Sequence, residues 1–130
     1  MRTKLLIGLS LLVMGVLALS SCGRPSEIVL DDNNNGSQIM LHTDQTLTIR
    51  LEGNPSTGFS WEVLEINEAV LRQVGDINFE VESNLPGSPG IQVLHFEPVA
   101  SGEMDLELVY WRPWEPEDPV ETYLLRVIVP

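Results

Sequence analysis

Three turn segments of this sequence contain the residue types that could bind another molecule. The first follows a strand-like run and consists of Asn54, Pro55, Ser56, Thr57, Gly58 and Phe59. Proline fixes its own φ at about −65° and keeps the preceding asparagine extended, and that asparagine can close a turn onto the backbone two residues on. Glycine permits a positive φ and the close approach of another backbone. The segment is predicted to be a stiff, projecting loop with small hydroxyl groups at its tip or, alternatively, an ordinary turn between strands.

The other two segments are also rich in proline, and the third adds side chains that are typical of binding sites. The second segment ends in Gly87, Ser88, Pro89 and Gly90, has little side-chain bulk and by itself indicates only a loop. The third contains Arg112, Pro113 and Trp114, of which Trp114 lies outside the strand alternation. Trp and Arg are enriched at binding hot spots, where each can contribute about 2 kcal/mol or more. Trp114 is therefore predicted to anchor a partner or, alternatively, to fold back and cap one end of the domain.

The sequence has no pattern of catalytic or metal-ligating residues. His42 and His95 are isolated in strand-like segments, and no cluster of His, Cys and Asp has the spacing of a zinc site. The only cysteine, Cys22, lies near the N-terminus, and neither a Gly-x-Ser-x-Gly turn nor a phosphate-binding glycine loop is present. A hydrolase that uses a pair of the many acidic residues is an alternative, but these residues alternate along strands as solvent-facing residues do. We expect a binding protein without a cofactor or a metal, not an enzyme.

Alternation of apolar and polar residues predicts a series of strands that would position the three segments. Successive side chains of a strand point to opposite faces, so a two-residue period indicates strands. Such runs occupy residues 46–51, 60–63, 77–82, 91–96, 104–110 and 123–129. Only residues 67–72 suggest a helix, of one turn, capped by Asn67. Without helical crossovers the strands must be mainly antiparallel, which predicts an all-β sandwich whose three segments could emerge at the same end.

The N-terminal residues predict export and attachment to a membrane. A basic start, an apolar run over residues 5–19 and small residues after it predict a signal peptide over residues 1–21. The alternative, a membrane-spanning helix, would need roughly 20 apolar residues. The sequence Leu19-Ser20-Ser21-Cys22 resembles the bacterial lipobox, in which the cysteine is lipidated and becomes the N-terminus. The alternative is cleavage nearby with Cys22 left as a free thiol. By the same resemblance, Gly23 does not signal inner-membrane retention, so the outer membrane or the cell surface is expected.

Beyond the signal peptide, the chain is predicted to form one small domain. Residues 22–37 are predicted to be the lipidated cysteine and a flexible tether, in which residues 28–30 could form an edge strand. Residues 38–130 are predicted to be the sandwich domain. The whole chain has a formal charge of −12, and loss of Arg2 and Lys4 with the signal leaves five arginines against 19 acidic residues, or −14. We expect no nucleic-acid partner, because phosphate binding needs basic patches.

Taken together, the three segments resemble those of the chagasin family of cysteine-protease inhibitors. That family carries Asn-Pro-Thr-Thr-Gly in a first loop, Gly-x-Gly-Gly in a second, and Arg-Pro-Trp or Arg-Pro-Phe in a third. Here residues 54–58 match the first motif with Ser56 in place of one threonine, and residues 112–114 match the third. The second segment departs from the family, because Pro89 replaces the third-position glycine and cannot donate a backbone hydrogen bond. The order and spacing of the motifs cover nearly all of the predicted domain.

The resemblance implies a fold and a function. It implies an immunoglobulin-like antiparallel sandwich, acting as a monomer, whose three loops enter the active-site cleft of papain-like cysteine proteases. Thr57 and its neighbours would lie over the catalytic Cys–His pair, with Trp114 as an anchor and Arg112 as its polar companion. Inhibition would be reversible, tight and competitive. The alternative is a surface-anchored, immunoglobulin-like adhesion or assembly module whose loops bind some other protein.

Overall fold

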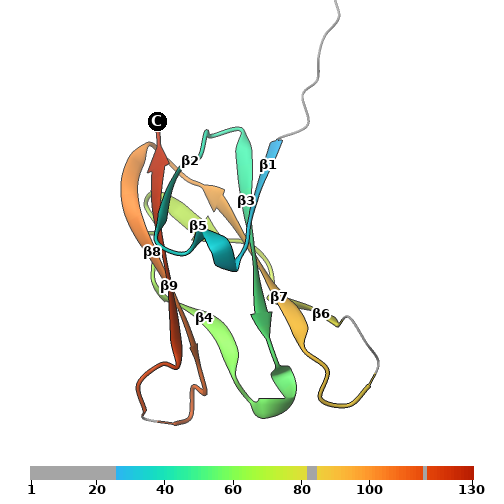
Figure 1. The fold of residues 1–130 in the computed structure, drawn as a ribbon. Helices are drawn as coiled ribbons and strands as arrows, with labels where there is room; N and C mark the ends of the chain where they lie inside the picture. The colour runs from blue at the N-terminus through green and yellow to red at the C-terminus, as the bar shows by residue number, and fades with distance from the viewer. Residues whose placement is uncertain (1–25, 82–84, 116) are drawn as a thin grey trace, which may run out of the picture.

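The computed structural model describes residues 26–81, 85–115 and 117–130, which fold into two facing β-sheets (Figure 1). The first sheet contains β1 (Ser26–Leu30), β3 (Gln45–Gly53), β5 (Leu71–Gln73), β6 (Asn78–Val81) and β7 (Gly90–Pro98). The second contains β2 (Ser37–Met40), β4 (Ser60–Glu65), β8 (Gly102–Trp111) and β9 (Glu121–Val129). Two short 3-10 turns, η1 (Asp32–Asn34) and η2 (Pro55–Thr57), lie in the connections after β1 and β3.

The apolar residues of both sheets meet in one core, which confirms the predicted all-β sandwich. Leu47, Ile49 and Leu51 of β3 are fully buried, and they face Leu106 and Leu108 of β8 across the interior. Burial of each such side chain contributes about 1.5–3 kcal/mol. A slip of one residue would turn a whole set to solvent, so the alternation also fixes the register of the strands.

The six predicted strands are all present, and most of the pairing is antiparallel. They correspond to β3, β4, β6, β7, β8 and β9, and the five antiparallel ladders join β3, β5 and β6 to β7 and join β4 and β9 to β8. Two edge strands differ, because β1 runs parallel to β3 and β2 runs parallel to β9. The order β1-β3-β7-β5 and the order β2-β9-β8-β4 leave β4 at the edge of its sheet.

Two local expectations need correction. β6 is a strand, but its alternation marks no buried face, because Phe79 and Val81 are both exposed. Residues 67–72 do not form a helix. Asn67 accepts backbone hydrogen bonds from Val70 and Leu71, both of 3.0 Å, which closes a single turn before β5 begins. The turn is too short to propagate as a helix, and Leu71 is buried in a strand instead.

The flexible tether predicted for residues 22–37 is wrong for residues 26–37, which belong to the sandwich. β1 adds an edge strand to β3, as the pattern of residues 28–30 allowed. Asp31 then caps η1 in a capping box, accepting a hydrogen bond of 2.9 Å from the backbone N–H of Asn33. Local polar side chains thus hold a segment that has no apolar periodicity of its own.

The predicted signal peptide and the predicted lipidation site at Cys22 lie outside the described residues. Within the described ranges no helix is long and apolar enough to span a membrane.

Candidate functional site

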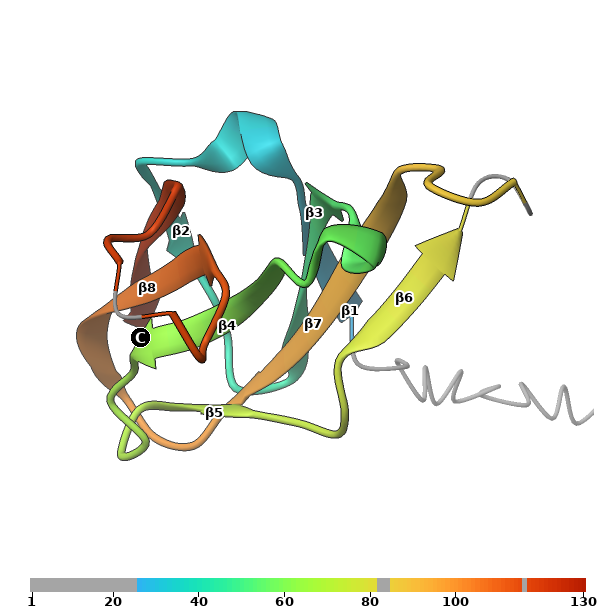
Figure 2. The same ribbon diagram turned by 90° about the horizontal axis from the view of Figure 1, so that it is seen from below.

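The three predicted segments lie together at one end of the sandwich. We call residues 54–59 loop 1, residues 85–89 loop 2, and residues 112–115 together with 117–120 loop 3. Gly53 pairs with Gly90, so the start of loop 1 lies beside the end of loop 2. Ser60 pairs with Trp111, so the end of loop 1 lies beside the start of loop 3. Seen from below, loop 1 lies between the other two (Figure 2).

Loop 1 is held by its own polar groups, as its sequence predicted. The side-chain oxygen of Asn54 accepts hydrogen bonds from the backbone N–H of Ser56 at 3.2 Å and from the Ser56 hydroxyl at 2.6 Å. The Thr57 hydroxyl donates to the carbonyl oxygen of Asn54 at 2.6 Å. Pro55 begins η2, and Gly58 ends it with a φ of 81°. The loop is therefore a compact turn and not an extended strand, and Thr57 lies exposed at its tip.

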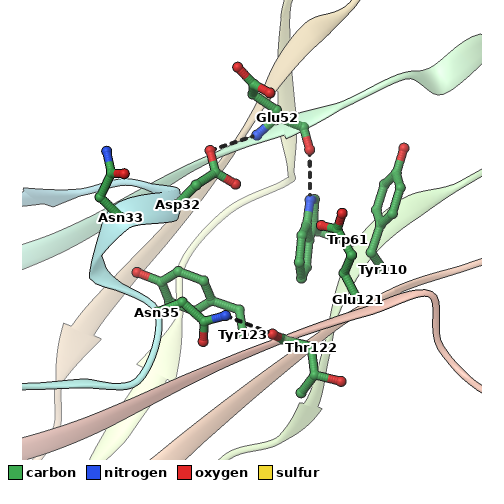
Figure 3. A pocket seen from close by; sticks show the side chains of 9 residues that line it. All are labelled: Asp32, Asn33, Asn35, Glu52, Trp61, Tyr110, Glu121, Thr122 and Tyr123. Atoms are coloured by element: carbon green, nitrogen blue, oxygen red, sulfur yellow. Dashed lines mark hydrogen bonds between the residues drawn. The ribbon is translucent and has the colours of Figure 1, made fainter.

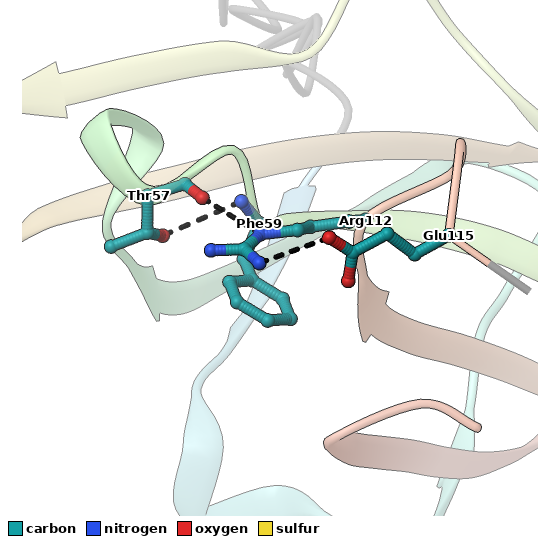
Figure 4. A network of polar contacts seen from close by, with 4 residues as sticks. All are labelled: Thr57, Phe59, Arg112 and Glu115. Atoms are coloured by element: carbon teal, nitrogen blue, oxygen red, sulfur yellow. Dashed lines mark hydrogen bonds and ion pairs between the residues drawn. The ribbon is translucent and has the colours of Figure 1, made fainter. Parts of the chain in front are cut away.

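Loop 3 contacts loop 1 through the side chain of Arg112 (Figure 4). The Nε of Arg112 donates to the carbonyl oxygen of Thr57 at 2.9 Å, and its Nη1 forms an ion pair with Glu115 at 3.1 Å. The guanidinium carbon lies 4.4 Å from the centre of the Phe59 ring, within the range of a cation–π contact. Arg112 thus contacts loop 1 by both charge and stacking, while Glu115 fixes the direction of the guanidinium.

Trp114 stays largely exposed and rests on loop 1. Its side chain is 68% exposed, so it does not fold back into the core to cap the sandwich. A β-carbon added to Gly58 would lie 2.7 Å from the Trp114 ring, so only a glycine allows the indole to approach so closely. An exposed indole of this kind offers a large apolar surface to a partner at small ordering cost.

Loop 2 contacts loop 1 more weakly. The Nδ2 of Asn54 donates to the carbonyl oxygen of Gly87 at 3.4 Å, and Gly87 has a φ of 79°. Gly90, predicted as a contact residue, is instead the buried first residue of β7. An added β-carbon there would lie 3.0 Å from the carbonyl oxygen of Glu80, so the glycine serves strand pairing. The contact surface that loop 2 can offer therefore ends at Ser88 and Pro89.

Two residues beneath loop 1 were not among the predicted site residues. The Tyr110 hydroxyl accepts a hydrogen bond of 3.0 Å from the backbone N–H of Asn54, and its ring stacks on Phe59 with centroids 5.4 Å apart. Gln92 is fully buried below the loop. A polar residue at an otherwise inward-facing strand position is the only sequence signal for Gln92, and Tyr110 is simply the last residue of the predicted strand 104–110.

A hollow of about 600 Å³ lies between η1, the end of β3 and the start of β9, next to loops 1 and 3 (Figure 3). Trp61, Tyr110 and Tyr123 form its aromatic wall, and carboxylates of Asp32 and Glu52 lie on its rim. Burial, together with the charges of nearby Asp31 and Asp32, raises the pKa of Tyr123 to about 12. No group of His, Cys, Asp and Glu within the described residues could hold a metal ion.

Residues 40–127 match the model of the family described as chagasin family peptidase inhibitor I42. Amoebiasin-1 of Entamoeba histolytica is 31% identical over 100 residues, which cover 77% of this chain and 97% of that protein. The family consists of peptidase inhibitors, which confirms the expectation of a binding protein and not an enzyme.

Solved structures show the same fold. The crystal structure of the cysteine protease inhibitor EhICP2 from Entamoeba histolytica has a TM-score of 0.72 and 22% identity, covering 81% of this chain and 96% of that one. The structure of PbICP-C in complex with falcipain-2 has a TM-score of 0.55 and 21% identity, covering 81% and 99%. These likenesses confirm the immunoglobulin-like sandwich.

Proposed function

We propose that this chain, which belongs to the chagasin family of peptidase inhibitors (I42), is a reversible, tight-binding inhibitor of papain-like cysteine proteases. The observation that carries the proposal is the cluster of three joined loops at one end of the sandwich, with Trp114 68% exposed among them. Loop 1 would enter the active-site cleft, and loops 2 and 3 would contact its two walls. About 800 Å² of surface per partner is the size of a standard interface of this kind.

The hydrogen bonding of loop 1 supports an inhibitor that is not cleaved. A protease needs an extended substrate whose carbonyl oxygen is free to enter the oxyanion hole. In loop 1 the carbonyl oxygens of Asn54 and Pro55 accept from the backbone N–H groups of Thr57 and Gly58, both at 3.2 Å. The carbonyl oxygen of Thr57 accepts from Arg112. Each of these three oxygens therefore already accepts a hydrogen bond within the inhibitor.

The same contacts support tight binding. A loop that is ordered before it meets the protease loses little conformational entropy on binding. The complex of the structural neighbour PbICP-C with falcipain-2 supports a cysteine protease as the class of partner.

Titration of papain tests this function. A chain that starts at residue 23 keeps every described strand and turn, since the first of them begins at Ser26. We expect one equivalent to abolish hydrolysis of a small fluorogenic substrate, with competitive kinetics and recovery of activity on dilution. Trypsin serves as the control and should keep its full activity. Full papain activity at micromolar inhibitor would contradict the proposal.

We also propose that Cys22 is lipidated and that the domain is anchored to the cell envelope. The position of β1 supports this arrangement, because Ser26 pairs with Gln45 at the end of β3 opposite to loop 1 (Figure 1). An anchor at residue 22 would leave the three loops free to reach a protease. Replacement of Cys22 by serine should move the expressed protein from the detergent phase to the aqueous phase in a Triton X-114 partition. An unchanged partition would contradict lipidation.

A further inference from the structure

Gln92 has an unusual place for a polar side chain. It lies on β7 and is fully buried, and Thr48 is the other polar side chain buried to a similar degree within the described residues. The Gln92 amide makes two hydrogen bonds to the backbone of one residue. Its Nε2 donates to the carbonyl oxygen of Trp61 at 2.6 Å, and its Oε1 accepts from the Trp61 N–H at 2.7 Å.

These two hydrogen bonds take the place of those that a neighbouring strand would make to the outer edge of β4. Among the described strands, β4 is the edge of the second sheet and pairs with β8 alone. The N–H and carbonyl groups of Trp61 therefore have no strand neighbour on the side that faces β7. The Gln92 amide supplies one donor and one acceptor, as a neighbouring strand would. It ties the two sheets together two residues after loop 1 ends.

Trp61, whose backbone is held by Gln92, in turn restrains the strand residues at the base of loop 1. Its indole N–H donates to the carbonyl oxygen of Glu52 at 2.9 Å, as Figure 3 shows. Glu52 and Trp61 flank loop 1 in the sequence, so this bond closes the loop at its base. A β-carbon added to Gly53 would lie 3.8 Å from the Gln92 Oε1, which places the amide directly below the first residues of the loop.

We infer that Gln92 is a positioning residue for inhibition. It acts through Trp61 to fix how far loop 1 projects from the sandwich and how the loop is oriented relative to loops 2 and 3. Gln92 itself touches no partner, because it is fully buried. β4 needs such a restraint, since its register with β8 already shifts between Val63 and Glu65. This role rests on the proposed inhibition of papain-like proteases.

The test compares Gln92→Met with Thr48→Val in the chain that starts at residue 23. Methionine has a similar length but cannot bond to the Trp61 backbone. Thr48 is the matched control, because it is buried in the same sheet and its hydroxyl lies 2.9 Å from His95, remote from the loops. We expect both variants to lower Tm, but only Gln92→Met to raise Ki for papain, by about tenfold or more. Equal Ki values for Gln92→Met and the unchanged chain, or an equal loss in Thr48→Val, would overturn the role.

Hydrogen exchange provides a readout that does not depend on inhibition. The backbone N–H of Asn54 donates a hydrogen bond to the Tyr110 hydroxyl below loop 1. The N–H groups of Thr57 and Gly58 donate to carbonyl oxygens within the loop. In Gln92→Met these amides should exchange faster, while Thr48→Val should leave them unchanged. Unchanged exchange in Gln92→Met would overturn the role of Gln92, whereas a failure of the unchanged chain to inhibit papain would overturn the proposed function alone.

A third variant, Gln92→Glu, adds a pH profile for the case in which Gln92→Met does not fold. A protonated carboxyl can donate to the Trp61 carbonyl oxygen and accept from the Trp61 N–H, as the amide does, but an ionised carboxylate can only accept. Burial disfavours the charged form and raises the pKa of a carboxyl, so the ratio of its Ki to that of the unchanged chain should fall as the pH is lowered and the carboxyl takes up its proton. A large ratio that does not fall at low pH would overturn the role.

Discussion

Trp114 is the most exposed aromatic side chain at the loop end, so it can be truncated with little loss of packing. Trp114→Ala should raise Ki for papain by about 30-fold, which corresponds to the roughly 2 kcal/mol of a hot-spot residue. Its Tm should stay the same, because 68% of the side chain is exposed and little packing is lost. If thermal unfolding shows a lower Tm while inhibition is intact, Trp114 is a structural cap and not an anchor.

Gly58 provides a second test at the scale of single residues. Gly58→Ala should cost about 1–2 kcal/mol of stability, because its φ of 81° is unfavourable for other residues. The added β-carbon should also displace Trp114, whose ring would be 2.7 Å away, and so raise Ki.

The matched control is Gly75→Ala. Gly75 also has a positive φ, of 68°, but no atom lies within 4 Å of an added β-carbon. Denaturation should show a similar loss of stability in both variants, and enzyme assays should show a raised Ki in Gly58→Ala alone. A raised Ki in both would mean that general destabilisation, and not the displaced indole, weakens binding.

At the scale of elements, loops 1 and 3 act together because strand pairing brings them side by side and Arg112 then joins them. Arg112→Lys keeps the charge but loses the planar fork that reaches Thr57, Glu115 and the Phe59 ring at once. We expect papain inhibition to weaken by about fivefold to tenfold, since loop 1 becomes less ordered before binding.

Arg126 offers the control for that change. It also bonds two acidic side chains, Glu103 and Asp105, but on the outer face of the second sheet, away from the loops. Inhibition assays on Arg126→Lys should give the Ki of the unchanged chain. Equal effects of the two substitutions would show that the fork of Arg112 has no special part in binding.

The sequence was sufficient to predict those features that depend on neighbouring residues. Alternation predicted the six main strands, and Asn54, Pro55 and Gly58 predicted a stiff loop, because each acts on the backbone next to it. Gly90 was predicted to lie in a loop but is the first residue of β7, because whether a glycine lies in a loop or in a strand depends on a pairing partner far away in the sequence.

The supports of the loops could not be predicted for the same reason. Tyr110 bonds Asn54 across 56 residues, and Gln92 bonds Trp61 across 31. A polar residue at an inward-facing position marks Gln92, but no residue near Gln92 or Tyr110 in the sequence identifies its partner. Apart from the edge strand allowed at residues 28–30, the ordering of residues 26–37 was also missed, because β1 gains its hydrogen bonds from β3 and not from its own composition.

In the whole molecule, the start of β1, which follows the predicted anchor in the sequence, and the three loops lie at opposite ends. β3 has nine residues and rises by about 3.3 Å per residue, so the ends lie roughly 30 Å apart. Only residues 23–25 separate Cys22 from β1, and they reach at most about 14 Å. A lipid on Cys22 would therefore hold the β1 end close to the bilayer.

Energy transfer from tryptophan measures this orientation. A chain that starts at Cys22, its only cysteine, can be coupled there to a maleimide lipid in vesicles with dansyl headgroups. Trp61, Trp111 and Trp114 all lie at or next to the loops, so transfer should be weak. Val99→Trp, in the exposed turn at the other end, should transfer strongly. Equal transfer from the two proteins would contradict an outward orientation.

The most direct test of cleft occlusion by the three loops is the reactivity of papain's catalytic cysteine. Iodoacetamide alkylates that thiol in the free enzyme, and the rate can be followed by mass spectrometry. With one equivalent of this chain, from residue 23 onwards, alkylation should nearly stop, and it should resume on dilution. Alkylation at the rate of free papain, under conditions in which the two proteins are shown to bind, would contradict occlusion of the cleft by the loops.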